Sequence, residues 1–157
     1  MSTTATLAED IAGTAATEDL TVEFHTLGLA GCIDRLTAPL RRHGVLVRWE
    51  TPHHGIEIPA ASAVLLYRAA QEALSNVLRH SHASEVTVRL AAVFHGVRLI
   101  VTDNGVGYNP EEQVPSSRNH GYGVCLMTMA VHEAQGAISI ESVSGKGTRV
   151  SITLPLD

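Results

Sequence analysis

Apolar residues recur along this chain at two kinds of interval, and these intervals predict its helices and strands. A spacing of three or four positions predicts three helical stretches: residues 18–43, 59–81 and 124–135. The first should be one or two helices interrupted near Gly28 or Gly31. The second begins at Pro59, and the third ends at Gly136.

Shorter apolar runs predict five strands, which are residues 45–50, 85–94, 97–103, 137–143 and 148–154. His95-Gly96 would be the turn of one hairpin, and residues 144–147 the turn of another. Long helices are mixed with hairpins and do not alternate regularly with strands, which argues against a doubly wound parallel sheet. The pattern predicts an α+β fold, a two-layer α/β sandwich in which a mixed, mostly antiparallel sheet packs on about three helices.

Composition and charge narrow the class of protein. A chain of 157 residues that is 45% apolar can bury the core of one domain. Its net charge is −5, and its 11 lysines and arginines form no cluster denser than Arg41-Arg42, so no footprint for nucleic acid or an anionic membrane is visible. Cys32 and Cys125 match no metal spacing; a bridge between them stays open, but two lone thiols fit a reducing cytoplasm equally well. We expect a cytoplasmic segment, even if a parent protein is membrane-anchored.

The predicted helix of residues 59–81 carries a polar face. Projected at 100° per residue, its apolar side holds Leu66, Ala70, Ala73 and Val77, with Leu78 flanking. Glu72 and Asn76 are neighbours on the opposite side, because they are four residues apart. A solvated surface would also explain this face. Asparagine is, however, a poor mid-helix residue whose amide oxygen suits Mg²⁺, and a carboxylate one turn away could orient a water or accept a proton.

A strand that ends in an acid and two glycines is the second candidate site. Asp103 is followed by Asn104-Gly105-Val106-Gly107, and the Asn-Gly pair alone predicts a tight turn. Alternatively, close backbone approach at the glycines forms a pocket with Asp103 at its bottom. A carboxylate only accepts hydrogen bonds, so it would pair with the amino group of adenine and oppose the oxygen of guanine. An unpaired polar group costs about 1–3 kcal/mol, enough to prefer ATP over GTP.

Two further glycine segments could contact the same ligand. Gly121-Tyr122-Gly123 lies where a predicted loop of residues 104–122 passes into the next helix. The first N–H groups of that helix suit a phosphate, although many such glycines are plain caps. Residues 144–148 are an ordinary hairpin turn, unless the following strand lies beside Asp103, where Thr148 would line the pocket. The P-loop spacing G-x-x-x-x-G-K-[ST] is absent, so a nucleotide site here is of another kind.

The chain resembles the ATP-binding catalytic (GHKL, or HATPase) domain of bacterial sensor histidine kinases. Four segments carry the resemblance, in this order: residues 71–81, 103–107, 120–124 and 145–148. The wording YRAAQEALSNVLRHS is most similar to the NarX/DesK-type subfamily. The resemblance implies the Bergerat-type fold of that superfamily. It also implies three parts: a flexible tail of residues 1–17, a helical linker of residues 18–43 that resembles the end of a dimerisation region, and the ATP-binding domain of residues 44–157.

The resemblance implies a role for each candidate residue. Asn76 would coordinate a Mg²⁺ ion that bridges the phosphates of ATP, and Glu72 would be the catalytic acid that assists proton transfer or orients water. The implied ligand-binding residues are Arg79 and His80 near the phosphates, Asp103, Gly105, Gly107 and Thr148 around the adenine, and Gly121 and Gly123 at the phosphate-side lid.

The reaction implied is transfer of the ATP γ-phosphoryl group to a histidine on a separate dimerisation domain, for relay to a response regulator. His25 lacks the acid that follows the phosphoacceptor in such kinases, so we expect a fragment or one half of a split kinase that does not autophosphorylate alone. Residues 128–130 also depart from the family wording after the lid. Two alternatives stay open: a non-catalytic, nucleotide-responsive interaction module, and an anti-sigma-type serine kinase.

Overall fold

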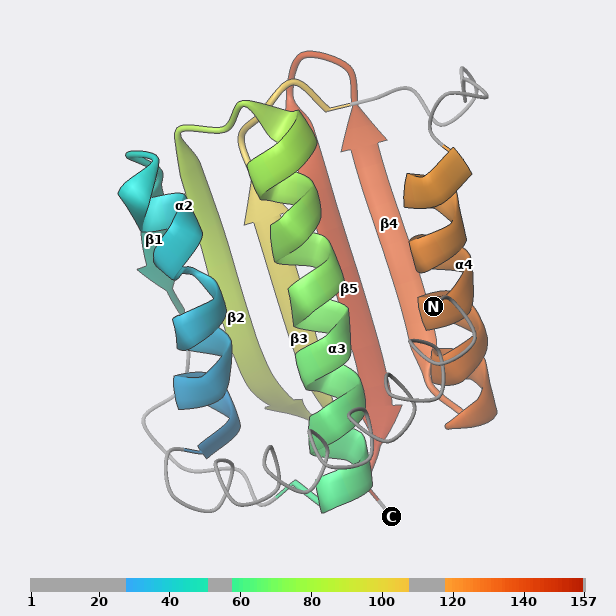
Figure 1. The fold of residues 1–157 in the computed structure, drawn as a ribbon. Coiled ribbons are helices and arrows are strands. Elements are labelled where there is room, and N and C mark those ends of the chain that lie inside the picture. The colour runs from blue at the N-terminus through green and yellow to red at the C-terminus, as the bar shows by residue number, and fades with distance from the viewer. Residues whose placement is uncertain (1–27, 51–57, 108–117, 157) are drawn as a thin grey trace, which may run out of the picture.

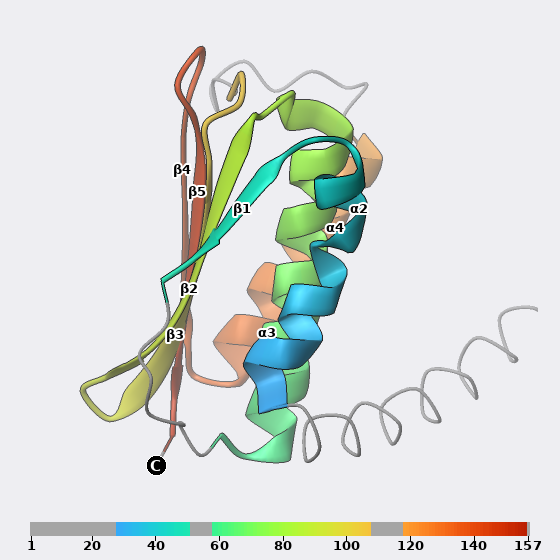
Figure 2. The ribbon, with the colours of Figure 1, turned by 90° about the vertical axis from the view of Figure 1, so that its left-hand side faces the viewer.

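A mixed sheet forms one layer of the molecule and helices cover one of its faces (Figures 1 and 2). In the computed structural model, residues 28–50, 58–107 and 118–156 are described. The predicted tail, the start of the predicted first helix with His25, and the loop predicted for residues 51–57 lie outside these ranges.

The five strands are β1 (Leu46–Trp49), β2 (Glu85–Val93), β3 (Gly96–Asp103), β4 (Ala137–Val143) and β5 (Gly147–Pro155). The helices are a segment of residues 28–36, α2 (Ala38–Arg42), α3 (Ala60–Asn76) with a π-helical turn Val77–Ser81, and α4 (Arg118–Glu133). None of the helices in these described ranges combines the length and apolar character needed to cross a bilayer.

The order of the strands in the sheet is β1-β2-β3-β5-β4. β1 runs parallel to β2, and the other neighbours are antiparallel. Val97, Leu99 and Val101 of β3 are buried in the core, because alternate residues of a strand face the same side and here that side packs on the helices. The expected α+β, two-layer sandwich with a mostly antiparallel sheet is confirmed.

α3 lies across the middle of the sheet (Figure 1). The residues on its sheet side that are at most 3% exposed are Ala63, Leu66, Ala69, Ala70, Ala73 and Leu74. Short alanine side chains let the helix lie close to the strands. After Asn76 the hydrogen bonding changes to the π-helical turn, and Leu78 is 38% exposed instead of flanking the buried side. The uniform 100° projection is wrong there, because a π turn holds more residues and each advances by a smaller angle.

The β2–β3 hairpin turns one residue earlier than the sequence predicted. The turn is Phe94-His95, with His95 at φ +55°, and Gly96 is already the first residue of β3. A Cβ atom on Gly96 would lie 2.5 Å from the carbonyl oxygen of Leu154. This glycine is therefore explained by the close approach of β5 and not by the turn.

α4 begins at Arg118, six residues before the start predicted at Val124. Gly121 and Gly123 therefore lie within its first two turns and do not precede it. Each glycine disfavours a helix by about 1 kcal/mol relative to alanine, which is why the sequence indicated a loop here. The apolar contacts of Met127 and Val131 with the core stabilise the helix nonetheless.

The segment that leads into β1 belongs to the same core as the sheet. Leu29, Ile33 and Leu40 are at most 7% exposed and pack in the main hydrophobic cluster. The carboxylate of Asp34 accepts hydrogen bonds from Trp49 Nε1 of β1 at 2.8 Å and from Arg41 Nη2 of α2 at 2.9 Å. The bond from Arg41 contributes most to lowering the pKa of Asp34. These two hydrogen bonds connect the helical segment of residues 28–36 to α2 and to the edge strand β1.

We expect Asp34→Asn to lower the free energy of unfolding by about 1 kcal/mol at neutral pH, because the charged acceptor is lost at a half-exposed site. Since the folded-state pKa lies below the usual value of 3.8, the contribution of Asp34 is present above about pH 4 and is lost as the pH falls through that lowered pKa. Urea unfolding at neutral pH and at about pH 3, followed by the fluorescence of the single tryptophan, measures both values. An equal loss at the two pH values would contradict this role.

Candidate functional site

Four element ends that are distant in the sequence converge at one end of the molecule. The upper end in Figure 1 holds the last residues of α3 and β3 and the first residues of β5 and α4. Figure 2 shows the ends of α3 and β3 and the β4–β5 turn at the same level from a second direction. Asn76 and Asp103, each the final residue of its element, therefore come to the same end, and Thr148 at the start of β5 joins them.

Asp103 is a buried acid on the helix-facing side of the sheet, with 7% of its surface exposed. Its carboxylate accepts a hydrogen bond from the backbone N–H of Gly105 at 2.8 Å and another from the backbone N–H of Thr148. Burial raises the pKa of Asp103, and the two hydrogen bonds oppose that rise. The carboxylate is thus held in one orientation at the base of the converging ends.

A row of cross-strand neighbours extends from Asp103 over the adjacent strands. Asp103 of β3 pairs with Thr148 of β5, which pairs with Ser142 of β4. Directly paired residues share a face of the sheet, so all three side chains belong to the helix-facing side. The strand of Thr148 therefore lies beside Asp103, which was the condition under which the sequence predicted that Thr148 lines the pocket.

Two glycines let the loop after β3 lie against the β4–β5 turn. Gly107 has φ +62°, and a Cβ atom on it would lie 2.2 Å from the carbonyl oxygen of Val143. Gly147 has φ +111°, and its Cβ would lie 2.1 Å from the carbonyl oxygen of Asp103. Only glycine combines these backbone angles with such close approach. Gly105, whose N–H holds Asp103, is buried in the same loop.

Asn104 has a structural role that the sequence did not reveal. Its amide oxygen accepts the N–H groups of Ser84 and Glu85, both at 3.0 Å, and its amide nitrogen donates to Ser84 Oγ at 2.9 Å. These bonds tie the loop after β3 to the start of β2. The Asn-Gly pair signalled only a turn, although asparagine commonly bonds nearby backbone in such turns.

The amide oxygen of Asn76 is buried, and no hydrogen bond to it is found within the described residues. A buried acceptor without a partner costs about 1–3 kcal/mol, which suggests a ligand that satisfies it. A neutral amide oxygen at the end of α3 suits a hard cation such as Mg²⁺, which accepts one or two protein oxygens and completes its shell with phosphates and water. The residues at this end therefore fit the metal implied by the sequence.

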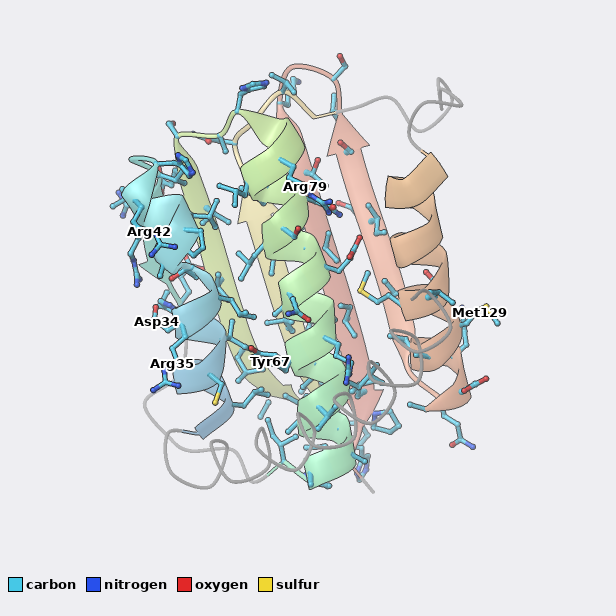
Figure 3. The ribbon with its side chains drawn as sticks, in the orientation of Figure 1. Asp34, Arg35, Arg42, Tyr67, Arg79 and Met129 are labelled. Carbon is cyan, nitrogen blue, oxygen red and sulfur yellow. The ribbon has the colours of Figure 1, made fainter. Side chains whose placement is uncertain are left out.

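The other polar residues of the α3 end are arranged around Asn76. Glu72 is half-buried, one helical turn before it. Arg79 is exposed in the π-helical turn, and its side chain extends from α3 toward the side of β4 and α4 (Figure 3). His80 belongs to the same turn, but its side chain lies outside what the structure describes. Gly121 and Gly123 lie in the first turns of α4, at the same end of the molecule.

A cavity of about 140 Å³ elsewhere on the molecule does not belong to this site. Its lining residues are Ser139 and Glu141 of β4 with Arg149 and Ser151 of β5. They alternate along β5 with the buried Val150 and Ile152, so they lie on the face that the helices leave open.

Comparison with known proteins identifies the class that this fold and site define. Residues 61–157 match the family described as histidine kinase-, DNA gyrase B-, and HSP90-like ATPase, and they are more than half of the chain. The chain therefore belongs to this family of ATPases, as the resemblance in the sequence implied.

The individual relatives are sensor histidine kinases. The chain is 43% identical over 91 residues to the sensor histidine kinase LiaS of Bacillus subtilis, a match that covers 58% of this chain and 24% of LiaS. It is 40% identical over 96 residues to the nitrate/nitrite sensor protein NarX of Escherichia coli, covering 61% of this chain and 15% of NarX. The matches thus cover a quarter or less of either relative, and the NarX-type resemblance is confirmed.

A solved structure shares the fold at lower sequence identity. The blue-light activated histidine kinase EL346 of Erythrobacter litoralis superimposes with a TM-score of 0.67 at 21% identity, covering 82% of this chain and 41% of that protein. Its isolated histidine kinase domain gives a TM-score of 0.64. These values show a common architecture, and the implied GHKL fold is confirmed.

Proposed function

We propose that this chain is the ATP-binding catalytic domain of a two-component sensor histidine kinase. It would transfer the γ-phosphoryl group of ATP to a histidine on a separate dimerisation domain, from which a response regulator receives it. The proposal rests on the buried oxygen of Asn76, which has no hydrogen-bond partner among the described residues and lies at the same end of the molecule as the buried carboxylate of Asp103. The named relatives favour this function over an interaction module or a serine kinase.

The adenine would bind against the row of cross-strand neighbours Asp103, Thr148 and Ser142. The Asp103 carboxylate, already oriented by two backbone N–H groups, would accept a hydrogen bond from the purine amino group. Guanine has an oxygen at that position, which would oppose the carboxylate, so ATP would be preferred over GTP. Gly105 and Gly107 would shape the wall of the pocket, and Thr148 would lie beside the purine.

The triphosphate would extend from the pocket toward Asn76. Asn76 would hold a Mg²⁺ ion that neutralises charge on the phosphates. Glu72, one turn away, would orient the attacking histidine or accept its proton. Arg79 and His80 would contact the phosphates from the π-helical turn. The backbone N–H groups around Gly121 and Gly123, near the start of α4, would contact them from the lid side.

Three parts of this chain would have different roles in the parent protein. Residues 1–17 would be a flexible tail, residues 18–43 would connect to the dimerisation region, and residues 44–157 would be the catalytic domain, against whose core Leu29, Ile33 and Leu40 of the connecting segment pack. The partners would be a histidine-bearing dimerisation domain and a response regulator. The segment would work in the cytoplasm, where ATP is available.

A phosphoryl-transfer assay tests this function. The chain would be mixed with a separate dimerisation domain of a NarX-type kinase, Mg²⁺ and γ-labelled ATP. We expect acid-labile label on the acceptor histidine, and none when that histidine is replaced by alanine. Label on serine would instead support the serine kinase. Saturable ATP binding without any transfer would support the interaction module.

A further inference from the structure

Asn104 completes the last rung of hydrogen bonds between β2 and β3 with its side chain. Its backbone N–H donates to the carbonyl oxygen of Glu85 at 3.2 Å, as expected for the rung that follows the pair Val86 and Asp103. The returning bond is different, because the N–H of Glu85 donates to Oδ1 of the Asn104 side chain at 3.0 Å. The amide oxygen therefore takes the acceptor position that the backbone carbonyl of Asn104 would hold in a regular antiparallel ladder.

This replacement sets the direction of the Gly105 N–H. The carbonyl of Asn104 and the N–H of Gly105 belong to one planar trans peptide unit and point in opposite directions. Because the side chain satisfies Glu85, the carbonyl is not required at β2, and the peptide unit can turn out of the ladder. Its N–H donates to the Asp103 carboxylate at 2.8 Å, which is the hydrogen bond of an Asx turn.

The orientation of the Asp103 carboxylate depends on this hydrogen bond. The carboxylate has two backbone donors, the N–H groups of Gly105 and Thr148. With both donors in place, the carboxylate is oriented before a ligand arrives, whereas with Thr148 alone it can rotate about its terminal bond. A ligand then has to fix that rotation as well, which lowers its affinity. Asn104, although it is exposed and bonded to β2, thus acts on the acid proposed to accept the adenine amino group.

We propose that Asn104 is a positioning residue for adenine: its amide oxygen replaces a backbone carbonyl at β2 and thereby directs the N–H of Gly105 to the Asp103 carboxylate. This inference rests on the proposed ATP site and names a further determinant of its specificity. Asn104 would act without touching the purine. A merely structural Asn104, which only holds the loop against the sheet, would instead affect all nucleotides equally.

A nucleotide without the amino group separates these two roles. Purine riboside triphosphate carries hydrogen in place of the amino group that Asp103 would bind and is otherwise identical to ATP. We expect Asn104→Ala to weaken ATP binding by roughly five-fold, the effect of one ordinary hydrogen bond. The affinity for purine riboside triphosphate should stay within a factor of about two. Competitive titration against a fluorescent ATP analogue gives both dissociation constants.

The ionisation of Asp103 provides a second measurement, which needs no nucleotide. The hydrogen bond from Gly105 opposes the rise in the pKa of Asp103 that burial causes. Its loss in Asn104→Ala should raise that pKa further, and NMR titration of the isotope-labelled carboxyl carbon measures this in the free chain. A loop that merely loosened would admit water to the carboxylate and lower the pKa instead.

Two matched variants complete the experiment. Asn104→Asp keeps an acceptor for the N–H groups of Ser84 and Glu85 and should retain the wild-type ratio of the two affinities. Ser84→Ala removes only the hydroxyl group to which Asn104 Nδ2 donates. It should affect neither nucleotide, because the amide oxygen keeps both of its donors.

An equal loss for both nucleotides in Asn104→Ala, or an unchanged or lowered pKa of Asp103, would overturn the inference in favour of a structural role. An unchanged affinity for ATP would overturn it as well, and the proposed function would stand. Failure of Asn104→Asp to keep the wild-type ratio would show that the amide oxygen is not the cause. If the wild-type chain did not bind ATP, the proposed function itself would fail and this inference with it.

Discussion

Replacing Asp103 by asparagine is expected to weaken ATP binding more than tenfold and to erase the preference for ATP over GTP. The carboxylate already accepts the N–H groups of Gly105 and Thr148 and would also accept the adenine amino group. An amide has one acceptor oxygen, so its NH₂ group must face one of these donors. Leaving a buried donor unpaired costs about 1–3 kcal/mol, roughly 5- to 150-fold in affinity.

Stability should respond much less than binding in Asp103→Asn. The variant loses accepted hydrogen bonds, but it also removes a charge whose burial opposes folding and raises the pKa of Asp103. Competitive titration of a fluorescent ATP analogue by ATP and by GTP measures the affinities, and urea unfolding measures the stability. Asp34→Asn, a distant acid on the helical segment, serves as the control and should leave both affinities unchanged. Unaltered nucleotide preference in Asp103→Asn would contradict purine recognition by Asp103.

Lowering the pH should weaken ATP binding by the wild-type chain, as the Asp103→Asn substitution should. Because the pKa of Asp103 is raised, protonation begins at a higher pH than for an ordinary aspartate, and the protonated group presents a donor to the adenine amino group. ATP affinity should therefore fall as the pH drops through that raised pKa. The free energy of unfolding should gain from protonation of Asp103 over the same range, since the neutral form is the one that burial favours.

Replacing Asn76 by alanine is expected to abolish the part of ATP affinity that depends on Mg²⁺ while making the free protein no less stable. The amide oxygen is buried and has no partner among the described residues, so its removal relieves a desolvation cost. Alanine also has the higher helix propensity, and the two effects together should raise the free energy of unfolding by about 1 kcal/mol. Binding and stability should thus change in opposite directions.

Titration of ATP with Mg²⁺ and with EDTA measures the metal-dependent part for wild type and variant. We expect at least a tenfold difference between the two conditions in wild type and little difference in Asn76→Ala. Ser75→Ala, at the neighbouring half-buried position of α3, should behave as wild type. A clear loss of stability in Asn76→Ala would show that this oxygen has a structural partner, and the metal site would have to be abandoned.

The elements that the sequence predicted well are those with a repeated apolar pattern. α3 and the strands from β2 to β5 lie within a few residues of their expected bounds, because burial on one face imposes the period of a helix or a strand. The π-helical turn after Asn76 was not predictable, since a change in backbone hydrogen bonding leaves no periodic signal. The start of α4 was placed too late because Gly121 and Gly123 lower local helix propensity, whereas tertiary contacts of the later turns stabilise the helix.

The residues of the site also fall into two groups, those that a sequence pattern indicates and those whose roles depend on contacts formed by folding. Glu72, Asn76 and Asp103 were identified as candidates because unusual residue types occupied regular elements. Asn104 was missed, because its role depends on hydrogen bonds to residues brought close only by folding, such as Ser84 and Glu85. Gly147 was read as part of an ordinary turn, although its missing side chain admits the carbonyl of Asp103.

A crystal structure of the chain with Mg²⁺ and a non-hydrolysable ATP analogue tests the central claim most directly. We predict Asn76 Oδ1 at about 2.0–2.1 Å from the metal. We also predict an Asp103 carboxylate oxygen at about 2.7–3.2 Å from the purine amino nitrogen of the same nucleotide. A nucleotide bound away from the shared end of α3 and β3, or a metal that leaves the Asn76 oxygen unligated, would contradict the account.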